Sequence, residues 1–171
     1  HLPRGKCLGG SSSINGMIYI RGQARDFDLW AQAGATGWDW ASVKPYFVAS
    51  VDQSRGQSQW HSTKGPLRIE DIKFKLPVCD ALIEAGISAG LAYNEDFNSA
   101  DQEGIGYYQT TMRNGRRWSA ANAYLDPIKN RHNLTIKPLT PIDHIKFDNN
   151  RAIGVVANGE EIIAEKEVIV C

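Results

Sequence analysis

The sequence is poor in cysteine, and its three cysteines stand far apart, at Cys7, Cys79 and Cys171. Their odd number argues against a disulfide framework, and no CxxC pair is present that would hold a metal ion. The chain also lacks an apolar run that approaches the ~20 residues of a membrane-spanning helix. We therefore expect a protein of a reducing compartment, with the three thiols buried as small apolar side chains.

An excess of one charge sign is absent as well, since 19 basic residues balance 19 acidic ones. A neutral chain creates no overall field that favours nucleic acid or anionic lipid. The densest group of basic residues is RNGRR, at 113–117. In this neutral background we interpret the group as a solvated turn, and we expect no nucleic-acid partner.

Three motifs of cofactor binding or catalysis are missing: the G-x-G-x-x-G dinucleotide fingerprint, the GxxxxGK[ST] phosphate loop and the G-x-S-x-G nucleophile motif. The histidines His61, His132 and His144 lack metal-ligand spacing and do not cluster with carboxylates, so no metal site is expected. A lone histidine is more often a surface or loop residue than a base. We therefore expect these histidines to lie at the surface or in loops.

Hydrophobic periodicity and capping signals predict four helices. They are expected at 26–33, from Asp39 onwards, at 76–90 and at 119–128. The first is expected to begin at an acidic N-cap, Asp26, and the third to bury one apolar face. Pro45 lies inside the second helix and predicts a kink or a short first turn.

Alternating or β-rich stretches predict strands at 17–22, 66–71 and 105–113. The segment from 133 to 171 predicts three more strands, joined by tight turns at 149–150 and 158–159. Helices and strands do not alternate regularly, so the fold class is α+β. Because the chain ends on VIVC, a buried-strand pattern, we expect it to be a segment of a longer protein.

The stretch GKCLGGSSSINGMIYIRG, residues 5–22, places two adjacent glycines beside three serines. Glycine costs backbone entropy unless a positive φ or a close approach requires it. Gly/Ser clusters are often exposed linkers, but the flanking Leu8, Ile14 and Ile18 are too apolar for one. We therefore favour a buried loop that faces a ligand, with serine hydroxyls and backbone N–H groups as donors to phosphate oxygens.

Long motifs in a fixed order carry a family resemblance along nearly the whole chain. PRGKCLGGSSSINGMIYIRG, followed by DFDLWAQAGATGWDWASVKPYF, resembles the glucose–methanol–choline (GMC) oxidoreductases, most closely their choline-dehydrogenase-like bacterial branch. HSTKGPLRI is similar to that family's HGTxGPL strand. YNEDFNSADQEGIGYYQTTMRNGRRWSAANAYLDP, NLTIKP and VIVC resemble later segments of the same family.

The resemblance implies FAD as cofactor and oxidation of an alcohol by hydride transfer to the flavin. Matched to the family's motif, the residues expected at FAD are Leu8, Gly9, Gly10, Ser11, Ser12, Asn15, Gly16, Met17 and Ile136. Asn15, Gly16 and Met17 are expected at the isoalloxazine edge, and Ile136 at the adenine. No histidine stands between Leu2 and Trp60, so we expect no covalent histidyl–flavin bond in this loop.

The same resemblance implies three parts. Residues 1–64 hold the flavin-contacting loop and helices of the FAD domain, and residues 65–128 form a segment of the substrate domain with part of its antiparallel sheet. Residues 129–171 form the strands that return to the FAD domain. The family's dinucleotide fingerprint and C-terminal catalytic histidine have no counterpart in this sequence. No catalytic residue is therefore assigned, and the segment alone is expected to be inactive. The alternatives are a non-catalytic binding module and a hydroxynitrile lyase on the same fold.

The expected substrate is a small alcohol, and overall similarity favours choline. A quaternary ammonium group would need aromatic neighbours, for which Tyr107, Tyr108 and Trp118 are loose candidates, although aromatic residues on strands are more often core. The electron acceptor is not indicated. We expect a cytoplasmic or peripherally membrane-associated protein of bacterial type.

Overall fold

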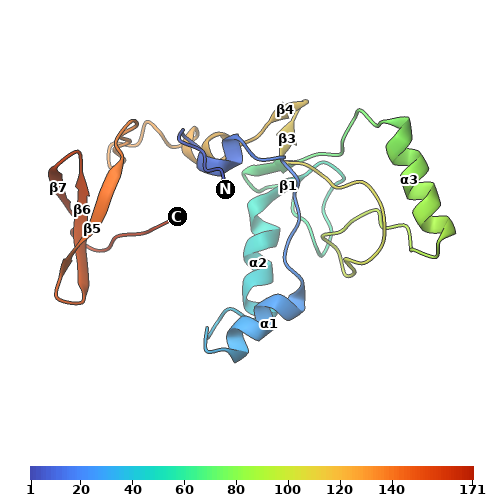
Figure 1. Cartoon of the computed structure of the whole chain (residues 1–171), viewed down its shortest axis with the longest axis horizontal. Helices are drawn as coiled ribbons and strands as arrows, with labels where there is room; N and C mark the ends of the chain where they lie inside the picture. Colours follow the sequence, from blue (N-terminus) through green and yellow to red (C-terminus); the bar gives the residue numbers. More distant parts are fainter. The chain divides into compact units, whose positions relative to one another are not determined.

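The computed structural model describes the whole chain, residues 1–171. It divides into two units, His1–Asn130 and Arg131–Cys171. Helices and small sheets occur together, and the last sheet is the antiparallel meander drawn in orange and red in Figure 1. The predicted mixture of helices with a C-terminal β-meander is therefore confirmed. The assignment of 1–64, 65–128 and 129–171 to cofactor and substrate domains stays a prediction.

The first two helices pack through aromatic rings. α1 spans Ala24–Gln32 and α2 spans Trp40–Ser50. Phe27 is buried, with ring centroids 5.6 Å from Trp40 and 5.5 Å from Phe47. The predicted cap of α2 is confirmed, since Asp39 accepts from the Ser42 N–H.

The N-cap of α1 differs from the prediction. It is Gln23, and Asp26 lies three residues further on, where its carboxylate accepts the Gln23 N–H at 2.8 Å. An acidic residue in the first turn favours the helix whether or not it is the cap itself, because it faces the positive end of the helix dipole. The sequence therefore predicts the helix correctly but places its N-cap three residues too late in the chain.

α3 spans Pro77–Ser88, with Pro77 in its first turn as predicted. None of its residues is buried, and Val78 and Leu82 keep 69% and 66% of their surfaces exposed. The apolar face expected from periodicity is thus present but uncovered within this chain. No helix of the structure combines the length and the apolar character needed to cross a membrane.

Unit 1 contains two short sheets. β1, Val51–Gln53, pairs in parallel with β2, Leu67–Ile69. β3, Met112–Arg113, and β4, Arg116–Arg117, form a hairpin across the predicted Asn-Gly turn. Both turn residues have positive φ, 54° at Asn114 and 76° at Gly115, as such a tight turn requires.

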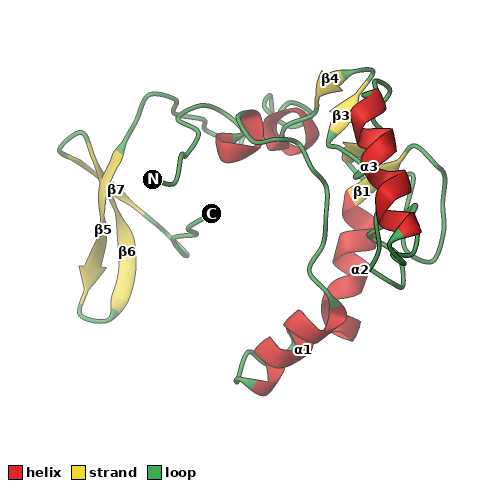
Figure 2. Cartoon of the chain, turned by 45° about the vertical axis from the view of Figure 1, so that its right-hand side comes forward, coloured by secondary structure: helices red, strands yellow, loops and turns green.

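The strand predicted at 105–113 is largely absent as a regular element. Only Met112–Arg113 belongs to a sheet, while Ile105 and Thr110 form isolated bridges to other segments. An alternating pattern can therefore mark an extended segment that joins several partners, without pairing along one of them. Figure 2 shows how much of unit 1 between α2 and β3 is loop.

Unit 2 is a three-stranded antiparallel meander of β5, Ile142–Asp148, β6, Arg151–Ala157, and β7, Glu160–Ile163. Its turns fall where predicted, with positive φ at Asn149, Asn158 and Gly159. NLTIKP, at 133–138, and the closing VIVC do not form strands. A strand needs a neighbour to pair with, and this chain supplies none for either segment.

The core is small and rich in polar groups. The buried apolar residues are Phe27, Val51, Ile69, Phe97, Ala123 and Ala157, whereas the buried polar ones are Arg21, Gln53, His61, Glu70, Asn98, Gln109, Thr110 and Ser119. The expected burial of the thiols is wrong, since Cys7 and Cys171 are exposed and Cys79 is half-buried. Hydrogen bonds rather than apolar packing therefore fix much of unit 1.

Candidate functional site

The Gly/Ser stretch folds into a compact loop instead of an extended linker. Gly9 and Gly10 have φ of 86° and 54°, and Gly10–Ser13 then form a single 3-10 turn, η1. A Cβ on Gly9 would also lie 2.5 Å from the Ser13 Oγ. The glycines are thus required by the left-handed backbone itself, before any ligand is considered.

All three serine hydroxyls have partners within the stretch, and the Ser11 Oγ accepts the Gly5 N–H at 3.3 Å. The Ser12 Oγ donates to the Gly9 carbonyl at 2.5 Å and accepts the Ala120 N–H at 2.9 Å. The Ser13 Oγ donates to the Leu8 carbonyl at 2.8 Å. Contact of Ser12 with a phosphate oxygen would require exchange of its internal bond, so the predicted roles of Ser11 and Ser12 at FAD stay predictions.

Beyond the serines, the backbone of Met17 is held in an unusual conformation. Its φ is 62°, which is uncommon for a residue with a side chain. The Asn15 Oδ1 accepts the Met17 N–H at 3.0 Å, and the Thr111 N–H donates to the Met17 carbonyl at 2.8 Å. Strained backbone held from both sides is typical of functional sites, where geometry matters more than stability.

One arginine fastens the middle of the loop. The Arg117 guanidinium donates to the Ser12 carbonyl at 2.9 Å, to the Asn15 Oδ1 at 2.7 Å and to the Asn15 carbonyl at 2.7 Å. Arg117 belongs to β4 and is half-buried, so the interpretation of RNGRR as a purely solvated turn is wrong for this residue. No local signal marks it, because its partners are about a hundred residues away.

The outer side of this loop is open. A Cβ on Gly16 would meet nothing within 4 Å, and Gly16 is not in the left-handed region, so neither conformation nor internal crowding requires a glycine there. The Asn15 Nδ2 donates to no protein atom, although its Oδ1 has two donors. A flat group lying against Gly16 and accepting from Asn15 would account for both features, which fits the edge of a flavin.

Past the loop, Arg21 ties several segments together. It is 5% exposed. Its side chain donates to the Tyr19 hydroxyl at 3.0 Å and to the carbonyls of Trp60 at 2.8 Å and Phe47 at 3.4 Å. The Asn98 side chain bonds to the backbone of the same segment: its Oδ1 accepts the Arg21 N–H, and its Nδ2 donates to the Tyr19 carbonyl. Arg21 is thus committed to protein partners.

His61 lies in the same buried cluster, in a loop as predicted but not at the surface. It is 4% exposed, with its Nε2 2.7 Å from Asp96 and its Nδ1 3.5 Å from the Arg21 Nη2. Because Arg21 can only donate, the Nδ1 accepts and the Nε2–H donates to Asp96. Desolvation raises the pKa of Asp96, but the bonds from His61 and the Asn98 N–H outweigh it and lower the pKa.

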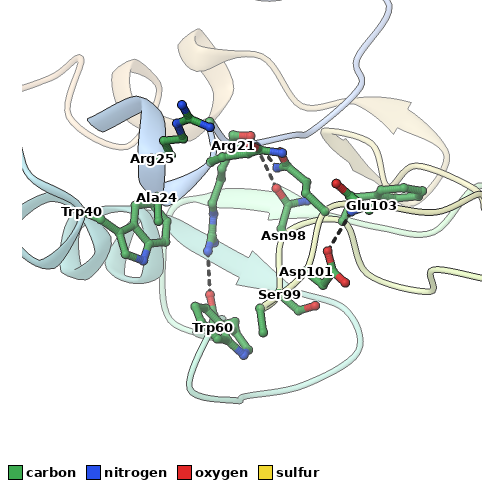
Figure 3. A pocket seen from close by; sticks show the side chains of 14 residues that line it. Arg21, Ala24, Arg25, Trp40, Trp60, Asn98, Ser99, Asp101 and Glu103 are labelled. Carbon is green, nitrogen blue, oxygen red and sulfur yellow. Dashed lines mark hydrogen bonds between the residues drawn. The ribbon is translucent and has the colours of Figure 1, made fainter. Parts of the chain in front are cut away.

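A cavity of about 330 Å³ opens beside this cluster (Figure 3). Its walls include the beginning of α1, at Ala24 and Arg25, the indoles of Trp40 and Trp60, and the loop at 98–103. Figure 3 shows Arg21 at the cavity with its bonds running to the walls. Since those donors are already used, the cavity offers few free polar groups from Arg21.

The other predicted residues are exposed, lie outside this loop or have other partners. Leu8 is 52% exposed, and Ile136 belongs to unit 2. Tyr107 donates to Asp80, and Tyr108 packs on Phe97 with ring centroids 4.6 Å apart. Trp118 is covered by the Arg113 guanidinium and donates to the Pro66 carbonyl. The three aromatic candidates therefore have separate partners and do not form one cage.

No cluster of three or more metal-binding side chains is present.

The family model described as GMC oxidoreductase matches residues 1–171. Oxygen-dependent choline dehydrogenase from Brucella anthropi is 48% identical over 98% of this chain and 31% of its own length. The crystal structure of pyridoxine 4-oxidase from Mesorbium loti is 34% identical with a TM-score of 0.87, over 95% of this chain and 33% of that one. An FAD-dependent oxidoreductase from Chaetomium thermophilum is 25% identical with a TM-score of 0.83, over 92% and 30%.

The chain therefore belongs to the GMC oxidoreductases, a family of FAD-dependent enzymes that typically oxidise CH–OH groups. Within it, the chain is related to choline dehydrogenase. It spans about a third of the length of the relatives it matches.

Proposed function

We propose that this chain is the flavin-loop portion of an FAD-dependent enzyme that oxidises a small alcohol to an aldehyde, with choline as the favoured substrate. The observation that carries the proposal is the 48% identity to oxygen-dependent choline dehydrogenase over 98% of the chain. When bound, FAD would supply the hydride acceptor. The residues proposed to contact it are Leu8, Gly9, Gly10, Ser11, Ser12, Asn15, Gly16, Met17 and Ile136.

The chain's own contribution would be binding and orientation. Gly16 leaves open space beside the loop, and the neighbouring Asn15 has an amide N–H group without a protein partner. Arg117 and Thr111 hold these residues from the inner side, so the donor would be in place before the ligand arrives.

His61 is not suited to act as the base. The ring of His61 is buried, and both of its nitrogens face protein partners, Asp96 and Arg21. A base must reach the proton that it abstracts, which this ring cannot do without breaking the cluster. As the family resemblance implies, the base is proposed to come from the part of the relatives that this chain does not span.

The test is an absorbance spectrum of the complete purified protein, followed by anaerobic titration with a panel of alcohols that includes choline. We expect flavin bands that bleach with at least one alcohol. A protein without flavin bands contradicts the proposal. Flavin bands that no alcohol bleaches favour the binding module instead, and cyanohydrin cleavage without bleaching favours the lyase. Mixing the reduced protein with oxygen or with a quinone then distinguishes the two acceptors.

A further inference from the structure

We infer that Arg117 is a positioning residue that fixes the side-chain amide of Asn15, so that the Asn15 Nδ2 is presented as a donor at the edge of the flavin. This inference rests on the proposed function, because it assigns the outer side of the loop to FAD. Arg117 itself faces the inner side and acts through Asn15.

The orientation of the Asn15 amide follows from its partners. The Met17 N–H at 3.0 Å and the Arg117 Nη1 at 2.7 Å both donate to one side-chain atom, which must therefore be the oxygen. The Nδ2 is then turned away from both donors and has no partner in the protein. Rotation of this amide would place its N–H groups against the guanidinium, so Arg117 excludes that rotamer.

Arg117 is itself well placed to impose this geometry. Its second nitrogen, Nη2, donates to the Asn15 carbonyl at 2.7 Å, and Nη1 also reaches the Ser12 carbonyl at 2.9 Å. β4 anchors the residue opposite Met112, and the Trp118 N–H bonds the Thr111 carbonyl at 2.9 Å. Thr111 also holds Met17, so one hairpin controls both residues next to Gly16.

A lysine could not do the same, because an ammonium group is a point charge without the planar fork that spans two acceptors. The neighbouring Arg116 provides a matched control. It has the same side chain on the same strand, but it is exposed and makes no side-chain hydrogen bond.

The experiment is a double-mutant cycle in the complete FAD-loaded protein. Arg117→Ala, Asn15→Ala and the double variant are compared by flavin midpoint potential and by visible circular dichroism of the bound flavin. Loss of one donor is expected to shift the flavin reduction equilibrium about three- to tenfold. We expect Arg117→Ala to shift it in the wild-type background and to add much less once Asn15 is alanine, when Arg117 keeps only its bonds to the Ser12 and Asn15 carbonyls. Arg116→Ala should leave both readouts unchanged.

Arg117→Lys serves as the second variant if Arg117→Ala does not fold, and it should give a smaller shift that also shrinks with Asn15→Ala. A shift of undiminished size in the Asn15→Ala background overturns the inference, as does a shift of equal size from Arg116→Ala. If the complete protein binds no flavin, the proposed function fails and this inference fails with it. Flavin binding with no effect of Arg117 contradicts the inference alone.

Discussion

One arginine, Arg117, holds the Gly/Ser loop, and another, Arg21, lies just past it; the two differ in what surrounds them. Arg21 is 5% exposed and joins Tyr19, Trp60 and Phe47, so its bonds connect elements of the interior. Arg117 is half-buried and makes all three of its side-chain bonds to the loop itself. The first arginine therefore maintains the fold, whereas the second shapes a surface whose outer groups are free.

The difference teaches how one short segment can be both rigid and open. A loop held by packing on all sides would have no face left for a ligand. Here Arg117 and Thr111 hold Asn15 and Met17 by hydrogen bonds, while a Cβ added to Gly16 between them would meet nothing within 4 Å. Substitutions at the two arginines should consequently separate stability from ligand geometry.

The largest effect is expected from Arg21→Ala. It leaves the Trp60 carbonyl without its side-chain donor, leaves the Phe47 carbonyl with the Ser50 hydroxyl alone, and removes the cation beside His61. We expect the free energy of unfolding to fall by about 3–5 kcal/mol, measured by urea denaturation. Arg25→Ala, at an exposed arginine with no side-chain bond, should stay within about 0.5 kcal/mol of the wild type. Equal losses in the two variants would refute the structural role of Arg21.

Arg117→Ala should cost less. Three charge-assisted bonds are lost, but water can replace the guanidinium at this half-buried position, so we expect about 1–2 kcal/mol. Limited proteolysis should then show faster cleavage within residues 9–17 and unchanged cleavage elsewhere. A loss as large as that of Arg21→Ala would mean that the two arginines do not differ in the way described.

We expect the loss of folding stability at acidic pH to depend on the protonation of Asp96. Its pKa is lower in the folded chain than its ordinary value of 3.8, since the bonds from His61 and Asn98 outweigh desolvation. The unfolded chain therefore binds more protons on acidification. The stability that this carboxylate confers is complete above the ordinary pKa and is lost as pH falls through the folded one.

Asp96→Asn should consequently cost about 1 kcal/mol near neutral pH and flatten the acid limb of the stability curve, measured by unfolding at a series of pH values. Glu103→Gln is the control, because the Glu103 carboxylate makes no hydrogen bond in the structure. An acid limb that is equally steep in Asp96→Asn and wild type would show that other carboxylates control it.

The smallest change in stability is expected at Gly16. Alanine fits its backbone and the open space around it, so Gly16→Ala should be neutral or stabilise the fold by less than about 1 kcal/mol. FAD retention on gel filtration should nevertheless fall, because the added methyl group occupies the outer side of the loop. Gly10→Ala, at φ 54°, should instead reduce stability, which separates the two glycines. Unchanged FAD retention in Gly16→Ala would contradict a close approach at this residue.

Much of the fold could be predicted because its signals are local. Asp39 caps α2 from the position expected, Pro77 begins α3, and Asn-Gly turns at 114–115 and 158–159 reverse the chain. Each of these depends on a few neighbouring residues. The Gly/Ser loop was also located correctly as a folded segment, since its apolar flanks argued against a linker.

The holding interactions of the site could not be predicted from the sequence. Arg117 lies 102 residues from Asn15, and Arg21 lies 40 from His61, so no spacing rule connects them. The same limit explains why the sequence predicted the loop position of His61 but not its burial, which involves Asp96 and Arg21 together. The sequence pattern of residues 133–138 predicts a strand. The pattern shows only that these residues could pair in a sheet, and this chain provides no strand for them to pair with.

The separation of 102 residues between Arg117 and Asn15 also sets the order of events during synthesis. A ribosome adds about 5–20 residues per second, so the Gly/Ser loop exists for about 5–20 s before its arginine is made. During that interval Met17 has no reason to keep a positive φ, and the segment samples the ordinary conformations of an unfolded chain. Its final shape is a late product of folding, although it stands near the beginning of the sequence.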